Sequence, residues 1–186
     1  MPRVPAIALV VRLTAVVLAA LGTGLPAGAA DVSKEYQVKA AFLFNIAKFV
    51  EWPPERRGED HEPVVIAVFR HNPFGSELAR MVEGRQVNGH PIAVRTVTNE
   101  QEIAAAHLVF VPDGQEEAFA GFEPAAAKAG VLTCGESEKF AAVGVISFLR
   151  QGDKVRFVVN LGAADRHHLK LSAQLLKLAQ SVRRED

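Results

Sequence analysis

Three apolar runs of the sequence, 64–69, 108–111 and 131–133, each end in a polar loop where a small molecule could bind. The candidate side chains in these loops are Arg70, Asn72, Asp113 and Glu136. In open α/β sheets, ligands bind beyond the carboxyl ends of parallel strands, where helix N-termini also favour anions. If the three runs are neighbouring parallel strands, their loops form one candidate ligand pocket. The alternative is ordinary solvated loop polarity.

The sequence contains none of the common catalytic or nucleotide-binding motifs. It has no G-x-x-x-x-G-K-[ST] loop, and Gly22-Thr23-Gly24 does not continue as G-x-G-x-x-G. A nucleophile elbow is also missing, because Gly135-Glu136-Ser137 continues as Glu138-Lys139. We therefore expect no catalytic residues, no cofactor and no enzymatic activity.

Histidine and cysteine offer little metal or redox chemistry. Of the six histidines, His167 and His168 are adjacent, and neighbouring side chains on a helix do not face each other, so we expect no metal site. The single cysteine, Cys134, cannot close an intramolecular disulfide. It is read as a small buried side chain at a strand end, or alternatively as an intermolecular or redox-sensing thiol.

Strand and helix patterns alternate along the middle of the chain. The expected strands are 64–69, 91–97, 108–111 and 131–133, and the expected helices are 73–83, 99–105, 116–129 and 137–140. The run 64–69 is continuously apolar, which is typical of a parallel strand buried on both faces. Two further strands, 143–149 and 155–160, form a hairpin with a five-residue link, and a helix over 165–182 follows.

These elements predict an α/β fold. We expect a three-layer sandwich with a mostly parallel central sheet, a C-terminal antiparallel hairpin and a docking helix.

The first thirty residues have the composition of a secretory signal peptide. Arg3 and Arg12 precede an apolar run, 13–25, that is followed by small side chains. We expect cleavage after Ala29 or Ala30, with a single domain over 31–186. An uncleaved anchor is the alternative, although the apolar core is shorter than the roughly 20 residues that a membrane span needs. We expect no membrane span in the mature chain.

Charge gives no indication of a nucleic-acid partner. The sequence has 21 basic and 21 acidic residues, and two of the basic ones, Arg3 and Arg12, lie in the predicted signal peptide. The remaining chain is close to neutral, without a basic patch dense enough to neutralise phosphates. Binding to nucleic acid is therefore not expected.

The helix predicted over 33–50 has apolar side chains on two nearly opposite sides. One stripe contains Tyr36, Ala40, Leu43, Phe44, Ala47 and Val50, and the other contains Val38, Phe42, Ile46 and Phe49. Such a helix needs cover on both sides. Either it is enclosed within its own fold, or the second stripe contacts a second subunit or a partner. The predicted contact surface is Phe42, Ile46, Phe49 and Trp52.

Four segments, in this order, make the chain resemble a known family. They are 38–53, which ends in Phe-Val-Glu-Trp-Pro, then 131–136, 155–160 and 169–179. On these segments the chain resembles the YfiR-like family of exported proteins, over the whole mature region. The first segment is the specific one, and the other three are generic individually.

The resemblance implies a periplasmic α/β regulator that restrains an inner-membrane diguanylate cyclase. Its expected partner is the periplasmic sensor portion of that enzyme, and the resemblance also implies a homodimer. The best-known member has disulfides, so the single Cys134 makes intramolecular redox control doubtful here. The alternative function is a periplasmic small-ligand sensor or carrier that uses Arg70, Asn72 and Glu136.

Overall fold

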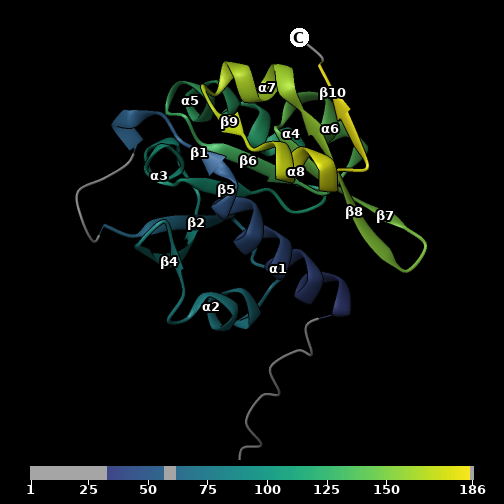
Figure 1. The fold of residues 1–186 in the computed structure, drawn as a ribbon, viewed down its shortest axis with the longest axis horizontal. Coiled ribbons are helices and arrows are strands. Elements are labelled where there is room, and N and C mark those ends of the chain that lie inside the picture. Colours follow the sequence, from purple (N-terminus) through teal and green to yellow (C-terminus); the bar gives the residue numbers. More distant parts are fainter. Residues whose placement is uncertain (1–32, 57–61, 185–186) are drawn as a thin grey trace, which may run out of the picture.

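The computed structural model describes residues 33–56 and 62–184, so the predicted signal peptide and its cleavage site lie outside the described residues. Figure 1 shows a curled sheet with helices on both of its faces and a small second sheet beside it. The predicted α/β class is confirmed, including a mostly parallel central sheet.

Eight strands of the described chain form the central sheet. In spatial order they are β10 (Ser181–Arg183), β8 (Lys154–Asn160), β7 (Ile146–Gln151), β6 (Leu132–Gly135), β5 (Leu108–Phe110), β2 (Val64–Phe69), β4 (His90–Val97) and β3 (Gln86–Val87). The five strands from β7 to β4 are mutually parallel, whereas β8 and β3 pair antiparallel to their inner neighbours. Because β2 lies between β5 and β4, the chain reverses its direction of travel across the sheet between β2 and β5. Such a reversal is the usual ligand crevice of a doubly wound sheet.

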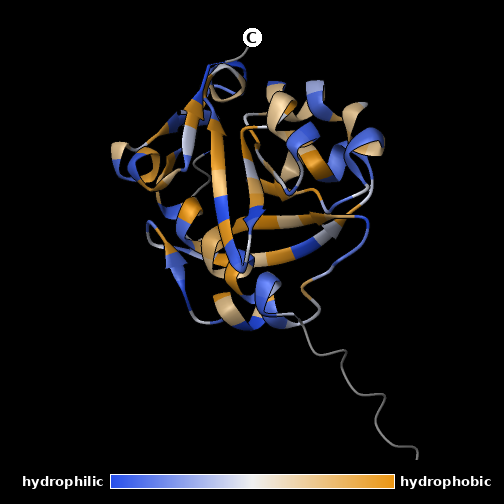
Figure 2. Ribbon diagram, turned by 90° about the vertical axis from the view of Figure 1, so that its right-hand side faces the viewer, coloured by the Kyte–Doolittle hydropathy of each residue, from blue (hydrophilic) through white to orange (hydrophobic). Residues whose placement is uncertain are grey.

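Helices cover both faces of this sheet and create two apolar clusters. One face packs against α1 (Lys34–Lys48), α2 (Glu77–Val82), α7 (Leu161–Arg166) and α8 (Ala173–Leu178). The other packs against α3 (Glu100–Ala105), α4 (Glu116–Ala120), α5 (Glu123–Lys128) and α6 (Glu138–Val143). All six residues of β2 are buried, alternating between the two clusters, which explains its continuous apolar run. Figure 2 shows the apolar character concentrated along the strands.

The first helix lies across one face of the sheet, as Figure 1 shows. It begins after Ser33, whose side chain accepts a hydrogen bond from the backbone of Tyr36, as predicted for an N-cap. The ring of Phe42 lies 5.8 Å from that of Phe148 and 5.7 Å from that of Phe157. Within the second apolar stripe, Phe42 therefore packs against β7 and β8 of its own chain. After α1 the chain forms β1 (Val50–Glu51), which pairs antiparallel with β9 (Lys170–Leu171), and then a short helix, η1 (Pro54–Arg56).

The predicted start of the second helix is wrong. Asn72 does not cap a helix, because its side chain accepts a hydrogen bond from the backbone of Phe74 and donates one to the carbonyl of Gly75. Such local bonds favour a turn over a helical start. The helix α2 begins only after Ser76.

The helix predicted over 116–129 is split into α4 and α5. The break falls at Gly121 and Phe122, and Pro124 occupies the first turn of α5. Proline has no backbone N–H, so Pro124 cannot donate to the carbonyl of Ala120 and continue α4, whereas it is well tolerated in the first turn of a new helix.

Two hairpins differ from the sequence prediction. The β7–β8 link consists of Gly152 and Asp153, with Gly152 at a φ of 59°, instead of five residues. The short strand β3 was not predicted, although Asn88 and Gly89 form a two-residue turn with φ of 53° and 87°. An Asn-Gly pair is the strongest short hairpin signal, so this hairpin could have been read from the sequence.

The long helix predicted over 165–182 is wrong in extent. The chain there forms the end of α7, then β9, α8 and β10 in succession. Ser172 starts a new helix by accepting from the backbone of Leu175, and His168 takes a left-handed conformation with a φ of 55°. The docking helix is present as the six-residue α8, which buries Leu175 in the core.

Candidate functional site

The carboxyl edge at the reversal between β2 and β5 is occupied by a side-chain network that includes Glu136. The Oε1 atom of Glu136 accepts hydrogen bonds from the Tyr36 hydroxyl at 3.0 Å and the Asp113 backbone N–H at 2.7 Å. Its Oε2 atom accepts from the ammonium group of Lys39, which also pairs with Glu35. The side chain of Glu136 is 2% exposed and that of Lys39 is 5% exposed. The first two turns of α1 thus cover the crevice.

This network changes the chemistry of Tyr36. Burial, followed by the nearby negative charge of Glu136, raises the pKa of the Tyr36 hydroxyl. The phenol therefore stays protonated and remains a hydrogen-bond donor to the carboxylate. Glu136 has three partners, and a ligand that needed its carboxylate would have to displace α1.

Of the other predicted pocket residues, Asp113 joins the network through its backbone N–H, whereas Arg70 and Asn72 do not join it. Arg70 is exposed, has a φ of 55° and places its guanidinium 4.9 Å from the ring centre of Phe69. Asn72 is used in its own turn. Asp113 lines a hollow of about 380 Å³ together with acidic side chains that include Glu116 and Glu138. Among the described contacts, Glu136 meets Asp113 but neither Arg70 nor Asn72.

The predicted contact surface on the first helix is mostly covered by its own fold. Ile46 is 1% exposed and Trp52 is 7% exposed, whereas Phe42 and Phe49 are half-buried. On α1, Val38 keeps 43% of its surface exposed. Leu178 at the end of α8 is 60% exposed. Val38 belongs to the second apolar stripe of the sequence analysis, but neither Val38 nor Leu178 was included in the predicted contact surface.

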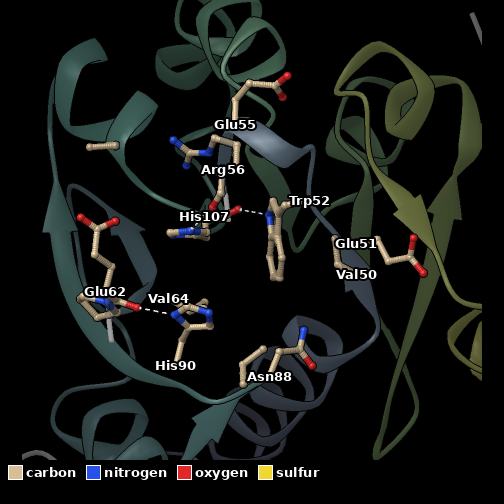
Figure 3. Close-up of a pocket in the computed structure, with 13 residues that line it drawn as sticks. Val50, Glu51, Trp52, Glu55, Arg56, Glu62, Val64, Asn88, His90 and His107 are labelled. Carbon is tan, nitrogen blue, oxygen red and sulfur yellow. Dashed lines mark hydrogen bonds between the residues drawn. The ribbon is translucent and has the colours of Figure 1, made fainter. Parts of the chain in front are cut away.

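A second cavity, larger than the acidic hollow, lies at the opposite edge of the sheet, where the parallel strands begin. It has a volume of about 500 Å³ and lies between the end of β1, the β3–β4 hairpin, the start of β2 and the residue before β5. Figure 3 shows the rings of Trp52, His107 and His90 around the hollow. Sequence reasoning missed this site, because its side chains come from four separate segments.

Two aromatic walls of the cavity are held rigidly. The Trp52 indole N–H donates to the carbonyl of His107 at 3.0 Å, and the two rings meet edge to face with centres 5.6 Å apart. The Nδ1 atom of His107 accepts from the backbone N–H of Val65, so the proton resides on Nε2, which lies 3.0 Å from the carbonyl of Arg56. Burial, with the positive charge of Arg56, lowers the pKa of His107. His107 is therefore a neutral, fixed ring.

Arg56 and His90 are two further polar residues of the cavity lining. Arg56 donates to the carbonyls of Ala104 and Ala106 at the end of α3, and burial lowers its pKa. Its role is to cap α3. The Nδ1 atom of His90 lies 3.0 Å from the carbonyl of Glu62, an arrangement in which the imidazole N–H donates.

The described residues contain neither a metal-binding cluster nor a membrane-spanning helix. Across residues 33–56 and 62–184, no group of three or more His, Cys, Asp and Glu side chains is arranged to hold a metal ion. None of the described helices is long and apolar enough to cross a lipid bilayer.

His167 is buried, and its ring nitrogens lie 2.6 Å from the carbonyl of Val131 and 2.9 Å from Glu123. It serves to join α5, β6 and α7.

Comparison with known protein families shows where the chain belongs. A family model described as YfiR/HmsC-like matches residues 36–180, which is most of the chain and nearly all of the described fold. This chain belongs to the YfiR/HmsC-like family. The match includes most of α1, Glu136 with its partners Tyr36, Lys39 and Asp113, and the three rings of the cavity, and it confirms the resemblance seen in the sequence.

Solved structures show only a distant likeness. The ABC domain from Streptococcus pneumonia in complex with L-Trp has 11% identity and a TM-score of 0.46, over 63% of this chain and 56% of that one. A conserved domain protein from Vibrio cholerae has 11% identity and a TM-score of 0.47, over 80% of this chain and 60% of that one. This chain thus spans less than two thirds of either protein. The comparison with curated proteins found no match.

Proposed function

We propose that this protein is a periplasmic regulator that restrains a membrane diguanylate cyclase by binding the periplasmic portion of that enzyme. The observation that carries the proposal is membership of the YfiR/HmsC-like family over residues 36–180. It rests on the function that the family resemblance implies. The signal-peptide pattern of residues 1–30 supports export.

The structure supports a role in binding over one in catalysis. The buried Glu136 is fully engaged by Tyr36, Lys39 and the Asp113 backbone, and His107 and His167 are held by backbone carbonyls. None of these groups has the free acceptor or donor that a general base or acid needs in reach of a substrate. The candidate site therefore favours a protein that acts by contact.

The surface proposed for that contact is the outer side of α1 together with the end of α8. Val38 and Leu178 are large apolar side chains that remain exposed on these two elements, and the half-buried Phe42 lies one turn after Val38 on α1. Exposed apolar side chains of this kind are typical of interaction surfaces. Phe49 lies further along the helix and belongs to the same proposed surface. A homodimer through this face is part of the proposal.

The level of cyclic di-GMP in cells tests the proposed function. Deleting the gene is expected to raise the level, and restoring the full-length gene is expected to lower it again. A gene that lacks codons 2–30 should fail to restore control, because its product would not reach the periplasm. Unchanged cyclic di-GMP after deletion, or full restoration by the leaderless gene, would contradict the proposal.

A further inference from the structure

We propose that the cavity between Trp52, His107 and His90 binds a small planar aromatic molecule that carries a protonated amine. This site goes beyond the protein contact proposed above and does not depend on it. The contact surface includes Val38 and Leu178, neither of which lines the cavity.

The size and construction of the cavity suit a small molecule. Its volume of about 500 Å³ falls within the range of roughly 300–1,000 Å³ that is usual for small-molecule sites. Apolar side chains from separate elements, Val50, Val64 and Val87, complete the lining. A site assembled from four elements of one fold is largely pre-formed, which reduces the entropy cost of binding.

The walls present aromatic rings whose polar atoms are already used. The indole N–H of Trp52 is bonded to a carbonyl, and both ring nitrogens of His107 have backbone partners. What these two residues offer a ligand is therefore ring surface at fixed positions. Planar rings pack well in such a setting, through offset or edge-to-face contacts.

His90 supplies a free hydrogen-bond acceptor. Its Nδ1–H is engaged with the Glu62 carbonyl, so in the neutral ring Nε2 carries a lone pair. Among the described residues Nε2 has no hydrogen-bond partner, and Figure 3 shows the His90 ring facing the hollow opposite Trp52. A ligand N–H would satisfy this atom.

Charge around the cavity favours a cation over an anion. Three carboxylates, Glu51, Glu55 and Glu62, line it against one guanidinium, that of Arg56. Arg56 is committed to the carbonyls of Ala104 and Ala106. In Figure 3 the side chains of Glu51 and Glu55 point away from the hollow. Their negative charges therefore attract a cationic ligand at a distance, without contacting it directly. The face of Trp52 adds a cation–π contribution.

Fluorescence of Trp52 gives a direct readout, because it is the only tryptophan in the sequence. The purified protein is titrated with phenethylamine, phenethyl alcohol and hydrocinnamate, which share a ring and differ in charge. We expect a saturable change with phenethylamine and an apparent affinity for hydrocinnamate that is at least about tenfold weaker. No saturable change with any probe, or equal affinity for the amine and the carboxylate, would overturn the proposal.

Variants test whether the change in Trp52 fluorescence comes from binding in the cavity. His90→Leu removes the free acceptor and is expected to weaken phenethylamine binding by about tenfold, and the exposed Glu62→Gln by a few-fold. Glu62→Gln provides the same test should His90→Leu fail to fold.

Glu138→Gln, in the separate acidic hollow, is the matched control and should bind like the wild type. If Glu138→Gln weakened binding as much as Glu62→Gln, the effect would be one of overall charge and the site would be wrong. Cyclic di-GMP levels would still test the protein contact independently.

Discussion

At the residue scale, the pair formed by Lys39 and Glu136 has the strongest consequence for stability. Both side chains are almost completely buried, and the carboxylate also receives the Tyr36 hydroxyl and the Asp113 N–H. Removing one member of a buried ion pair leaves an uncompensated charge and typically costs about 3–5 kcal/mol. The pair therefore fixes α1 over the carboxyl edge of the sheet.

We expect Lys39→Met to lower the free energy of unfolding by about 3–5 kcal/mol in urea titrations, because Glu136 loses its cation. The double variant Lys39→Met with Glu136→Gln should recover part of that loss, since no buried carboxylate remains. Glu77→Gln, which breaks the more exposed pair with Arg80, is the control and should cost about 1 kcal/mol or less. A loss below about 1 kcal/mol for Lys39→Met would show that the pair does not hold the helix.

Cys134 gives a second test at this scale. The thiol is free and fully buried at the end of β6, as the first reading of the sequence predicted, and burial raises its pKa. The thiol therefore stays protonated in the folded state and is unreactive. Ellman's reagent at pH 8 should modify it only after urea unfolds the protein. Rapid modification of the native protein, or a disulfide-linked dimer on non-reducing gels, would instead support the redox-sensing alternative.

At the scale of single elements, the apolar stripe of α1 that contains Val38 and Phe42 is open at its start and covered by the fold further along. Phe42 contacts Phe148 and Phe157, whereas Val38, one turn earlier, is exposed. The two positions on one helix therefore separate folding from binding.

Val38→Asp should leave circular dichroism and the free energy of unfolding within about 0.5 kcal/mol of the wild type, because surface substitutions rarely cost more. It should nevertheless weaken the proposed dimer, seen as a smaller mass in size-exclusion chromatography with light scattering. Phe42→Asp should unfold the protein or destabilise it by about 3 kcal/mol or more, because it places a charge against the core. A Val38→Asp protein that keeps the mass of a wild-type dimer, or a wild type that is monomeric throughout, would remove dimerisation from the account.

The elements also show what could be predicted from the sequence. The first helix and β2 follow from local signals, the Ser33 cap and the unbroken apolar run, and both lie where predicted. The segment 165–182 reads as a helix because its leucines recur at helical spacing. Its actual form depends on β9 pairing with β1 and β10 pairing with β8, partners that are distant in the sequence. Such pairings override local propensity.

The candidate site, too, could be predicted from the sequence only in part. The loops at the strand ends could be located from the order of the elements, and Glu136 and Asp113 do meet there. That α1 would fill this edge could not be foreseen, because Lys39 and Tyr36 lie 97 and 100 positions from Glu136 in the sequence. The cavity at the opposite edge depends on the Asn88–Gly89 turn to place His90 near Trp52 and His107.

At the scale of the whole molecule, two separate surfaces serve two proposed roles. The outer sides of α1 and α8 are proposed for a protein partner, and the cavity beside β1 for a small molecule. The segment 50–52 follows α1 directly and lines the cavity, so both surfaces share one continuous stretch of chain. A ligand in the cavity could change the binding of the partner only if the segment 50–52 has two conformations and the ligand binds one of them more tightly than the other.

In-cell photo-crosslinking tests the proposed contact most directly. A photoreactive amino acid is placed at Val38 on the outer side of α1 and, as a control, at Glu138 on the opposite face of the sheet. After irradiation, the account predicts a crosslinked product at position 38 that mass spectrometry identifies as a membrane diguanylate cyclase, and none at position 138. A processed, exported protein that gives no such product at position 38, or equal products at both positions, would contradict it.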